Sequence, residues 1–317
     1  MENYIKRNFS ILGMGLGTTF LGMKMKNPTV LASGILGTST SAVKFCADHG
    51  AGAVTIKSIS KDPRKGHDTP IVHCFQGGMM NAVGYSNPGY ELALSEFSNL
   101  KRVGVPVIGS IVAKDAEEFA FLTKEFVNKL EFDALEIPLS CPHTPGFGTL
   151  AGQSTPEATF AITKAIRTKT KIPLIIKLSP SVDNIGEVAK AAERGGADAI
   201  CAVNTLGPGL LIDVKSRKKI LGFGMGGVSG AALKPVALRT VYDIYEFVDI
   251  PIIGTGGIST GDDAIQMLMA GASIVGIGTA VAERGVGVFR KVCDELQQIL
   301  DQNGYNNVKD LIGAAHE

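Results

Sequence analysis

The chain has 317 residues, of which 45% are hydrophobic, and its 31 lysines and arginines nearly balance its 30 acidic residues. This length and composition are enough to bury the core of one large domain. The balanced charge produces no net field that would draw nucleic acid or anionic lipid, which argues against a basic-patch binding protein.

The beginning of the chain and its cysteines give indications of the cellular compartment in which the protein works. The apolar run at residues 11–23 is interrupted by glycines and threonines and closed by Lys24 and Lys26, so it is too short to span a bilayer. The opening residues also lack the unbroken apolar segment of a signal peptide. No CxxC pair occurs, so neither a zinc site nor a disulfide framework is indicated. The five cysteines are Cys46, Cys74, Cys141, Cys201 and Cys293. We expect a cytoplasmic protein that does not associate with membranes.

Eight short, apolar, β-branched runs recur along the chain. They lie at residues 28–33, 53–58, 105–112, 134–140, 173–179, 199–205, 251–256 and 274–280. Such continuous apolar runs are typical of strands that are buried on both faces of a parallel sheet. The intervening stretches have helical periodicity, as at residues 116–130, 155–167 and 260–270. Strand followed by helix, repeated, predicts right-handed βαβ units.

The repeat number favours a closed (β/α)8 TIM barrel over an open doubly wound sheet. No GxGxxG fingerprint opens the first helix, as a dinucleotide-binding sheet would usually require. No composition break or charge run marks a linker, so we expect residues 1–317 to form a single domain. The segments after strands 2, 4 and 6 are long and cover residues 59–90, 141–154 and 206–234. All three leave the C-terminal ends of strands, where barrel enzymes build active sites.

Two lysines stand at the ends of otherwise apolar strands, Lys57 in strand 2 and Lys177 in strand 5. A lysine in a buried strand is costly unless an anion or an electron-rich ligand accompanies it. Snorkelling to the surface is the alternative, but the surrounding apolar residues argue against it. A flavin would be a suitable partner, because reduced flavin carries negative charge that a fixed cation stabilises.

Cys141 directly follows strand 4 and opens a glycine-rich loop, with Ser140, Pro142 and His143 beside it. A lone cysteine is most often an inert buried residue. At a strand end beside the expected pocket, however, a thiol whose free pKa is about 8.5 can accept a proton once it is modestly tuned. We interpret Cys141 as a candidate general base and the other cysteines as structural.

Glycines gather at the ends of the last two strands, in the segments 254–258 and 276–280. Paired glycines let backbone N–H groups approach an anion closely, and the loops after strands 7 and 8 are the usual phosphate site of a barrel. The alternative is that they only make tight turns. Because the two signals fall on adjacent strands, the sequence predicts a phosphate site here.

These motifs, in this order, resemble the dihydroorotate dehydrogenase family over nearly the whole chain. The matching segments are residues 31–34, 56–58, 81–89, 139–142, 203–205 and 226–230, together with the two glycine pairs. The chain is most similar to the cysteine-base class, in particular the NAD-linked type whose catalytic subunit pairs with an electron-transfer subunit. The resemblance implies FMN as cofactor, a possible FAD and iron–sulfur partner subunit, and at least a homodimer.

The resemblance also implies roles for individual residues. Cys141 would remove a proton from C5 of dihydroorotate while a hydride passes from C6 to the flavin, and Lys57 would lie between flavin and substrate. The FMN-binding set would be Ser33, Lys57, Ser58, Ser110, Lys177, Val203, Gly230, Gly256, Gly257, Gly278 and Thr279. The substrate-binding set would be Lys57, Asn81, Ala82, Val83, Gly84, Tyr85, His143, Asn204 and Thr205.

The segment around Cys141 departs from the family pattern. Pro138 and His143 occupy places where the family usually has asparagines, and proline offers no side-chain donor. Because the cofactor-binding segments match the family, the leading interpretation is still oxidation of dihydroorotate to orotate in pyrimidine biosynthesis. The alternatives are a diverged flavin oxidoreductase acting on another dihydropyrimidine or unsaturated molecule, and a catalytically silent flavin- or phosphate-binding protein. Cys141, Lys57 and Lys177 argue against the silent protein, while the sequence leaves the electron acceptor open.

Overall fold

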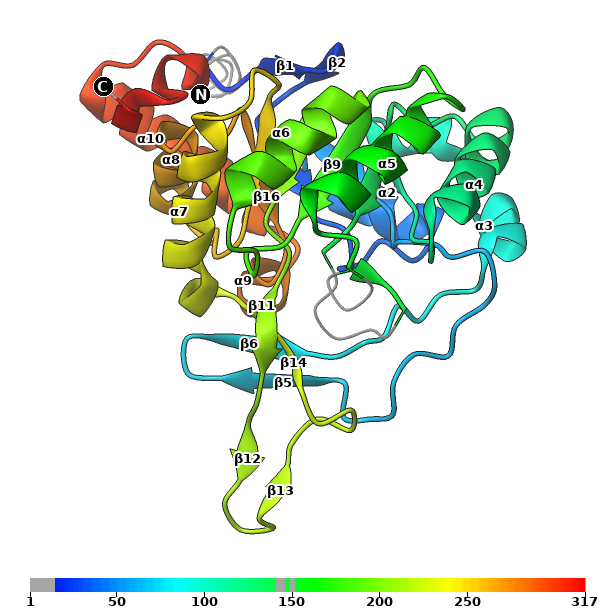
Figure 1. Cartoon of the computed structure of the whole chain (residues 1–317). Coiled ribbons are helices and arrows are strands. Elements are labelled where there is room, and N and C mark those ends of the chain that lie inside the picture. The colour runs from blue at the N-terminus through cyan, green and yellow to red at the C-terminus, as the bar shows by residue number, and fades with distance from the viewer. Residues whose placement is uncertain (1–14, 141–145, 149–151, 317) are drawn as a thin grey trace.

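The computed structural model describes residues 15–140, 146–148 and 152–316 (Figure 1). Eight parallel strands close into a barrel in the order β10-β15-β16-β3-β4-β7-β8-β9. The strands are β3 (Thr29–Leu31), β4 (Ala53–Thr55), β7 (Val107–Ser110), β8 (Ala134–Pro138), β9 (Leu174–Leu178), β10 (Ala199–Ala202), β15 (Ile252–Thr255) and β16 (Ile274–Ile277). Each falls inside one of the eight apolar runs, so the predicted barrel is confirmed.

Helices surround the barrel and cover the outer side of its strands (Figure 1). They are α2 (Thr40–Asp48), α3 (Tyr90–Glu96), α4 (Ala116–Lys129), α5 (Pro156–Arg167), α6 (Ile185–Gly195), α7 (Lys234–Tyr245), α8 (Gly261–Met269), α9 (Ala280–Arg284) and α10 (Val288–Asn303), with short 3-10 turns at Leu100–Val103, Ala231–Leu233, Val308–Leu311 and Ala314–His316. Three predicted helices, 116–130, 155–167 and 260–270, correspond to α4, α5 and α8. Thr155 and Thr260 cap α5 and α8 with their side chains.

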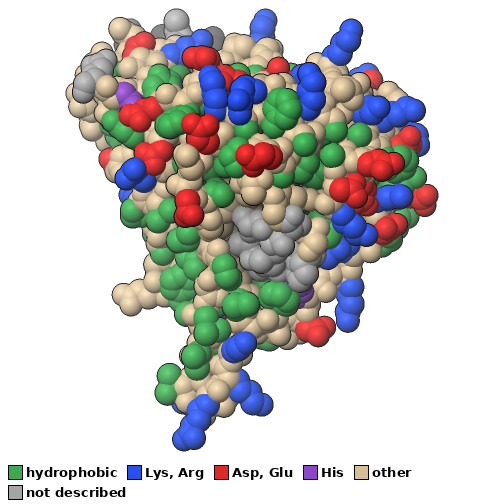
Figure 2. Space-filling view, in the orientation of Figure 1, with side chains coloured by type: hydrophobic (Ala, Val, Ile, Leu, Met, Phe, Trp, Pro, Cys, Tyr) green, Lys and Arg blue, Asp and Glu red, His purple; other side chains and the backbone are tan. Residues whose placement is uncertain are grey.

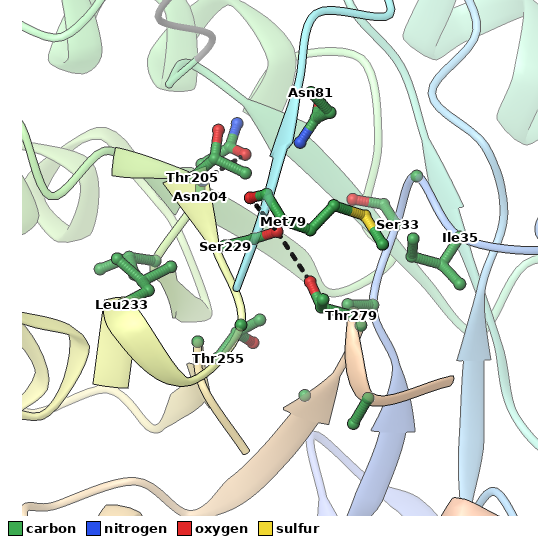
Figure 3. Close-up of a pocket in the computed structure, with 18 of the residues that line it drawn as sticks. Ser33, Ile35, Met79, Asn81, Asn204, Thr205, Ser229, Leu233, Thr255 and Thr279 are labelled. Carbon is green, nitrogen blue, oxygen red and sulfur yellow. Dashed lines mark hydrogen bonds between the residues drawn. The ribbon is translucent and has the colours of Figure 1, made fainter. Parts of the chain in front are cut away.

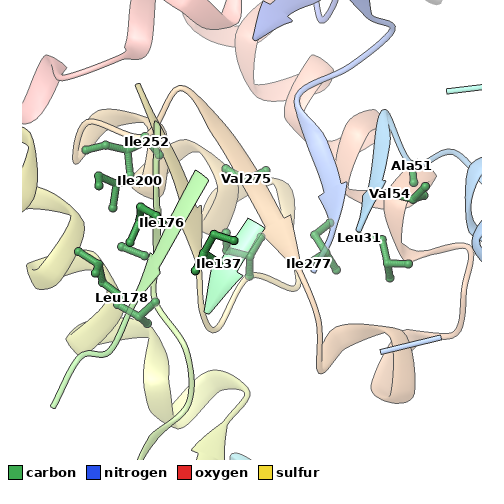
Figure 4. Packing of buried hydrophobic residues seen from close by; sticks show 14 of the residues in the cluster. Leu31, Ala51, Val54, Ile137, Ile176, Leu178, Ile200, Ile252, Val275 and Ile277 are labelled. Carbon is green, nitrogen blue, oxygen red and sulfur yellow. The ribbon is translucent and has the colours of Figure 1, made fainter. Parts of the chain in front are cut away.

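The main core lies between strands and helices. Outward-facing strand residues such as Ile137, Ile176 and Val275 belong to one cluster of buried apolar side chains, with exposures near zero (Figure 4). A second cluster fills the barrel interior, where Val30, Ile108, Ile175 and Ile253 face one another. Burial of both strand faces is the reason that these strands read as unbroken apolar runs.

One end of the barrel interior is closed by an antiparallel hairpin that the sequence patterns did not predict. Its strands are β1 (Thr18–Phe20) and β2 (Met23–Met25). Phe20, Met23 and Met25 are buried in the same cluster as the interior strand residues. The hairpin therefore blocks the N-terminal end of the barrel and leaves the C-terminal end for the site. Among the described residues, no helix is both long and apolar enough to cross a membrane.

The long segments that follow β4 and β10 are not loops along their whole length, because parts of them form strands. They supply β5 (Val72–Phe75) and β6 (Gly78–Asn81), and β11 (Leu206–Gly209) and β14 (Gly226–Ser229), which form one sheet in the order β11-β14-β6-β5. β6 and β14 join the two segments, with Asn81 opposite Gly227. This sheet stands over the C-terminal end of the barrel (Figure 1).

A small hairpin projects from this sheet into solvent. It consists of β12 (Ile212–Asp213) and β13 (Lys218–Lys219). Figure 2 shows lysine and arginine side chains at its tip and hydrophobic side chains nearer the body. Val214 has 87% of its surface exposed. The hairpin contributes no residue to the cavity described below.

Candidate active site

The barrel interior changes from apolar to polar toward its C-terminal end. Side chains two residues apart on a strand point to the same face, so the residues two positions beyond the interior apolar layer form the next layer up. On β8 and β9 this step runs from Ala134 to Glu136 and from Ile175 to Lys177. On β7 and β15 it leads to Ser110 and Thr255. These polar side chains are buried. A ring of polar groups therefore underlies the open end of the barrel.

A cavity lies above this layer and beneath the sheet formed by β5, β6, β11 and β14 (Figure 3). Every predicted FMN-binding residue lines it except Ser110, which is fully buried and hydrogen-bonded through its hydroxyl to that of Ser58 at 2.9 Å. The predicted substrate-binding residues on the cavity wall are Lys57, Asn81, Val83, Gly84, Tyr85, Asn204 and Thr205. Ala82 is fully buried away from the wall. Cys141 and His143 lie outside the described residues.

The glycines after β15 form a narrow cradle. Gly256 and Gly257 have φ angles of +128° and +73°, in a region that other residues rarely adopt. A Cβ atom on Gly257 would lie 2.4 Å from the Cβ of Lys234, so the backbone passes where a side chain could not. Just after β16, a Cβ on Gly278 would meet nothing closer than 3.7 Å. The cradle is therefore packed tightly on its outer side and open toward the cavity.

Asp263 holds the end of this cradle in place. Its carboxylate accepts hydrogen bonds from the backbone N–H groups of Ser259 and Thr260 at 3.0 and 2.9 Å, and from Lys234 Nζ at 2.7 Å. Burial alone would raise the pKa of Asp263, but these donors outweigh it and hold the pKa below its ordinary value. The loop that joins β15 to α8 is thus fixed by a charged residue of α8 itself.

Lys177 lies deeper, with its ammonium beneath the cavity. Nζ donates to Ser33 Oγ at 3.1 Å and lies 3.8 Å from Glu136 Oε1. Burial lowers the pKa of Lys177, but the charge of Glu136 more than compensates, so the pKa stands above its ordinary value. The prediction that this lysine is buried rather than snorkelling is confirmed, since its side chain is 5% exposed. Lys57 is only partly buried and lines the cavity wall at the end of β4.

The opposite wall carries amide and hydroxyl groups that come from different segments. Asn204 donates from Nδ2 to Ser140 Oγ at 3.0 Å and accepts from the backbone N–H of Thr205 at 2.8 Å. Thr205 Oγ1 is buried and has no hydrogen-bond partner within the described part of the chain. A buried hydroxyl on a cavity wall without a partner indicates that a ligand is expected to satisfy it. Asn81 approaches the same space from β6 (Figure 3).

Several residues of the site were missed by the sequence analysis. Figure 3 shows Met79 extending from β6 across the cavity between Ser229 and Ser33. No local pattern predicts that Met79 reaches the site, because β6 has only four residues. Glu136 and Thr255 could have been found, since each stands two residues beyond an interior apolar residue on its strand.

The fold and the cavity together define a class of protein. A cradle of glycines at the ends of the last two barrel strands, with a buried cation below and amide groups opposite, is the arrangement of a (β/α)8-barrel oxidoreductase that holds a flavin mononucleotide. Gly256 and Gly257 turn with positive φ at a point where a Cβ atom on either would collide with neighbouring side chains.

Comparisons with known proteins identify the family. Residues 15–300 match the model of the family described as dihydroorotate dehydrogenase. The chain is 43% identical over 306 residues to dihydroorotate dehydrogenase B (NAD(+)), catalytic subunit, of Methanocaldococcus jannaschii, covering 95% of this chain and 98% of that one. It is also 43% identical over 300 residues to the protein of the same name from Pyrococcus abyssi, covering 95% and 99%.

A solved structure agrees with this assignment. A dihydroorotate dehydrogenase from Eimeria tenella in complex with ferulenol superposes with a TM-score of 0.83 at 25% identity, covering 95% of this chain and 89% of that one. The chain belongs to the dihydroorotate dehydrogenase family, whose members are FMN-dependent oxidoreductases that act on a CH–CH group. The implied fold and cofactor are thereby confirmed.

Proposed function

We propose that this chain is the catalytic subunit of a dihydroorotate dehydrogenase that oxidises dihydroorotate to orotate in pyrimidine biosynthesis. One observation carries the proposal. A single cavity brings together the glycine cradle, Lys57, Lys177 and the amides of Asn81 and Asn204, in a chain that matches the family over residues 15–300. Relatives named for this activity are similar over nearly their whole length.

The cavity supplies a place for each part of the cofactor. The backbone N–H groups of Gly257 and Gly278 would bind the phosphate, and Thr279, which donates to Ser229 Oγ at 2.8 Å, would border the same end. Lys177 would lie under the polar edge of the flavin ring. When bound, FMN supplies a two-electron acceptor for the hydride that leaves the substrate.

The polar wall would hold the substrate ring. Asn81, Asn204 and Thr205 offer the amide and hydroxyl groups that a pyrimidine needs when water is excluded. Lys57 would neutralise the substrate carboxylate. Cys141 would act as the general base at C5, and it follows Ser140, which is buried and hydrogen-bonded to Asn204.

The electrons would leave through a partner. The relatives are named catalytic subunits of an NAD(+)-type enzyme, which supports pairing with a second subunit. We propose that this subunit carries the FAD and iron–sulfur groups. In the described part of the chain no group of three or more metal-binding side chains occurs. A homodimer or larger assembly of the catalytic subunit stays a prediction.

Pro138 favours one alternative, a related oxidoreductase for another dihydropyrimidine. It ends β8 opposite Lys177 and lines the cavity, where it offers neither a side-chain amide nor a backbone N–H. Each missing hydrogen bond to a buried ring would cost about 1–3 kcal/mol. Orotate recognition would then depend on the remaining amides.

An anaerobic half-reaction tests the proposal against the alternative. The purified protein is mixed with dihydroorotate, dihydrouracil or dihydrothymine in separate experiments, and loss of the oxidised flavin absorbance is followed. We expect rapid bleaching by dihydroorotate only. Bleaching by another dihydropyrimidine in its place would support the alternative, and no bleaching by any of them would contradict both.

A further inference from the structure

A buried carboxylate lies directly below the cavity floor and is not part of its lining. Glu136 stands in the middle of β8 with 3% of its side chain exposed. A carboxylate that is removed from water in this way is strongly disfavoured unless a cation and hydrogen-bond donors compensate it. Its partners therefore show what Glu136 does in the fold.

Three strands bring these partners together. Ser33, just after β3, donates its hydroxyl hydrogen to Glu136 Oε1 at 2.5 Å. The same hydroxyl oxygen accepts a hydrogen bond from Lys177 Nζ on β9 at 3.1 Å, and Nζ lies 3.8 Å from Glu136 Oε1. The serine thus bridges carboxylate and ammonium, and all three groups are fixed relative to the floor of the cavity.

The other surroundings of Lys177 carry no compensating charge in the part of the chain that the structure describes. On β10, Cys201 lies beside the pair, and burial raises its pKa to about 12, so the thiol stays neutral. On β15, Thr255 is a hydroxyl whose oxygen lies 3.7 Å from Cys201 Sγ. The charge that faces Lys177 inside the barrel is therefore that of Glu136.

We propose that Glu136 is a positioning residue that keeps Lys177 protonated beneath the flavin through the Ser33 bridge, and so fixes the number of protons taken up when the flavin is reduced. The inference rests on the proposed FMN site. Lys177 and Ser33 face the cavity, whereas Glu136 does not, so Glu136 acts on the cofactor only through them.

The electrostatics give the direction of the effect. Burial is the largest influence on the pKa of Lys177 and lowers it, and the Glu136 charge reverses the outcome. Without that charge, the lysine becomes neutral while the flavin is oxidised. The negative charge that arrives with two electrons then draws one proton from solvent onto Nζ. With Glu136 in place, the lysine is already charged and takes up no proton.

The test measures the midpoint potential of bound FMN by spectroelectrochemistry from about pH 6 to about pH 9, below the ordinary pKa of a lysine. We expect Glu136→Gln to take up one proton more per electron pair than the parent within this range. Lys177→Met and the double variant lack the titrating group and should show no additional proton. Asp198→Asn is the matched control, because it removes one carboxylate that pairs with Arg167 at the opposite end of the barrel.

Two results would overturn the proposal. One is that the midpoint potential of FMN depends on pH with the same slope in Glu136→Gln as in the parent, with or without a uniform shift of the potential. Lys177 would then keep its charge without Glu136. The other is an additional proton that persists in the Glu136→Gln, Lys177→Met double variant, since another group would then be its acceptor.

A measurement without FMN covers the case in which Glu136→Gln fails to bind it. Urea unfolding of the apoproteins should give a lower midpoint for Glu136→Gln than for the double variant, because the single change leaves a buried lysine without its counter-charge. Equal midpoints for the single and double variants would contradict the proposed pairing. Failure of the parent to bind FMN would count against the proposed function and would leave this comparison intact.

Discussion

At the scale of single residues, the predicted cofactor-binding groups and the predicted base are different residues. Lys177 is held by Ser33 and Glu136, and the backbone at Gly257 passes close to Lys234. Asn204 is also oriented before a ligand arrives, because both ends of its amide are already hydrogen-bonded. Because these groups are already fixed by their neighbours, the predicted base can be substituted without loss of the cofactor.

Cys141→Ala should therefore keep FMN and lose reduction of the flavin by dihydroorotate. The thiol would act on the substrate, whereas the predicted cofactor contacts lie on other strands. A general base usually contributes about 10²–10⁴-fold, so stopped-flow reduction should slow by this factor. Cys74→Ala, at an exposed cysteine on β5, is the control. Reduction of the Cys141 variant at the parental rate would contradict its role as the base.

Pro138→Asn should tighten orotate binding. The proline lines the cavity opposite Lys177 without a donor, and asparagine would supply an amide for the ring. A gain of one hydrogen bond is worth about 1 kcal/mol, or roughly fivefold in Kd, as measured by titration of the flavin absorbance with orotate. Weaker binding by the variant would show that the cavity recognises orotate through another geometry.

At the scale of elements, the connection between β15 and α8 is the most constrained part of the site. Two glycines with positive φ are followed by a capping box in which Thr260 and Asp263 satisfy each other's backbone N–H groups. Arg284 adds a hydrogen bond to the carbonyl of Ser259. The cradle therefore owes its shape to the start of α8 as much as to the glycines.

Asp263→Asn should loosen this connection and weaken both stability and FMN binding. Hydrogen bonds to a charged group contribute about 1.5–3 kcal/mol, and Lys234 would lose its partner. Because the folded-state pKa of Asp263 is lowered, its contribution is present above the ordinary pKa of about 4 and is lost as the pH falls through the folded value. The stability difference between parent and variant should thus shrink in acid.

Urea unfolding at neutral and acidic pH measures this difference. Asp262→Asn is the matched control, since Asp262 is the neighbouring carboxylate, is exposed and contacts only Gln266 on its own helix among the hydrogen bonds described. A loss of stability by Asp263→Asn that is independent of pH would show that the charge of Asp263 is not what holds the loop.

At the scale of the whole molecule, the cofactor should connect the barrel to the sheet above it. Ser33 and Lys177 belong to the barrel, whereas Met79 and Asn81 come from the sheet, and all of them line one cavity. A ligand that binds the native state stabilises it by RT ln(1 + [L]/Kd), so the stabilisation rises with the logarithm of the free ligand concentration.

Added FMN should therefore raise the Tm of the apoprotein, and heat release should recover one FMN per chain. At a concentration 100-fold above Kd the expected stabilisation is about 2.7 kcal/mol. FAD should have less effect, because no dinucleotide fingerprint is present in the sequence. Recovery of FAD or of a nicotinamide dinucleotide would contradict the predicted cofactor.

Residue patterns along the chain were enough to predict the barrel, its helices and the turns made by Gly256 and Gly257, whereas phosphate binding at these turns stays a prediction. Each of these depends on neighbours in the chain, through β-branched apolar runs, caps such as Thr155 and Thr260, and glycines whose positive φ excludes other residues. The importance of the two strand-end lysines could also be predicted, because a charge within an apolar run needs a partner wherever the fold places it.

Which groups from distant parts of the chain come into contact could not be predicted from the sequence. Ser33 and Glu136 are 103 positions apart, and their contact exists because barrel closure turns both into the same interior layer. Met79 and Asn81 reach the cavity because β6 pairs with β14, a long-range pairing that no local periodicity encodes. Local patterns specify the elements, while contacts between remote segments depend on how the closed barrel brings strand ends together.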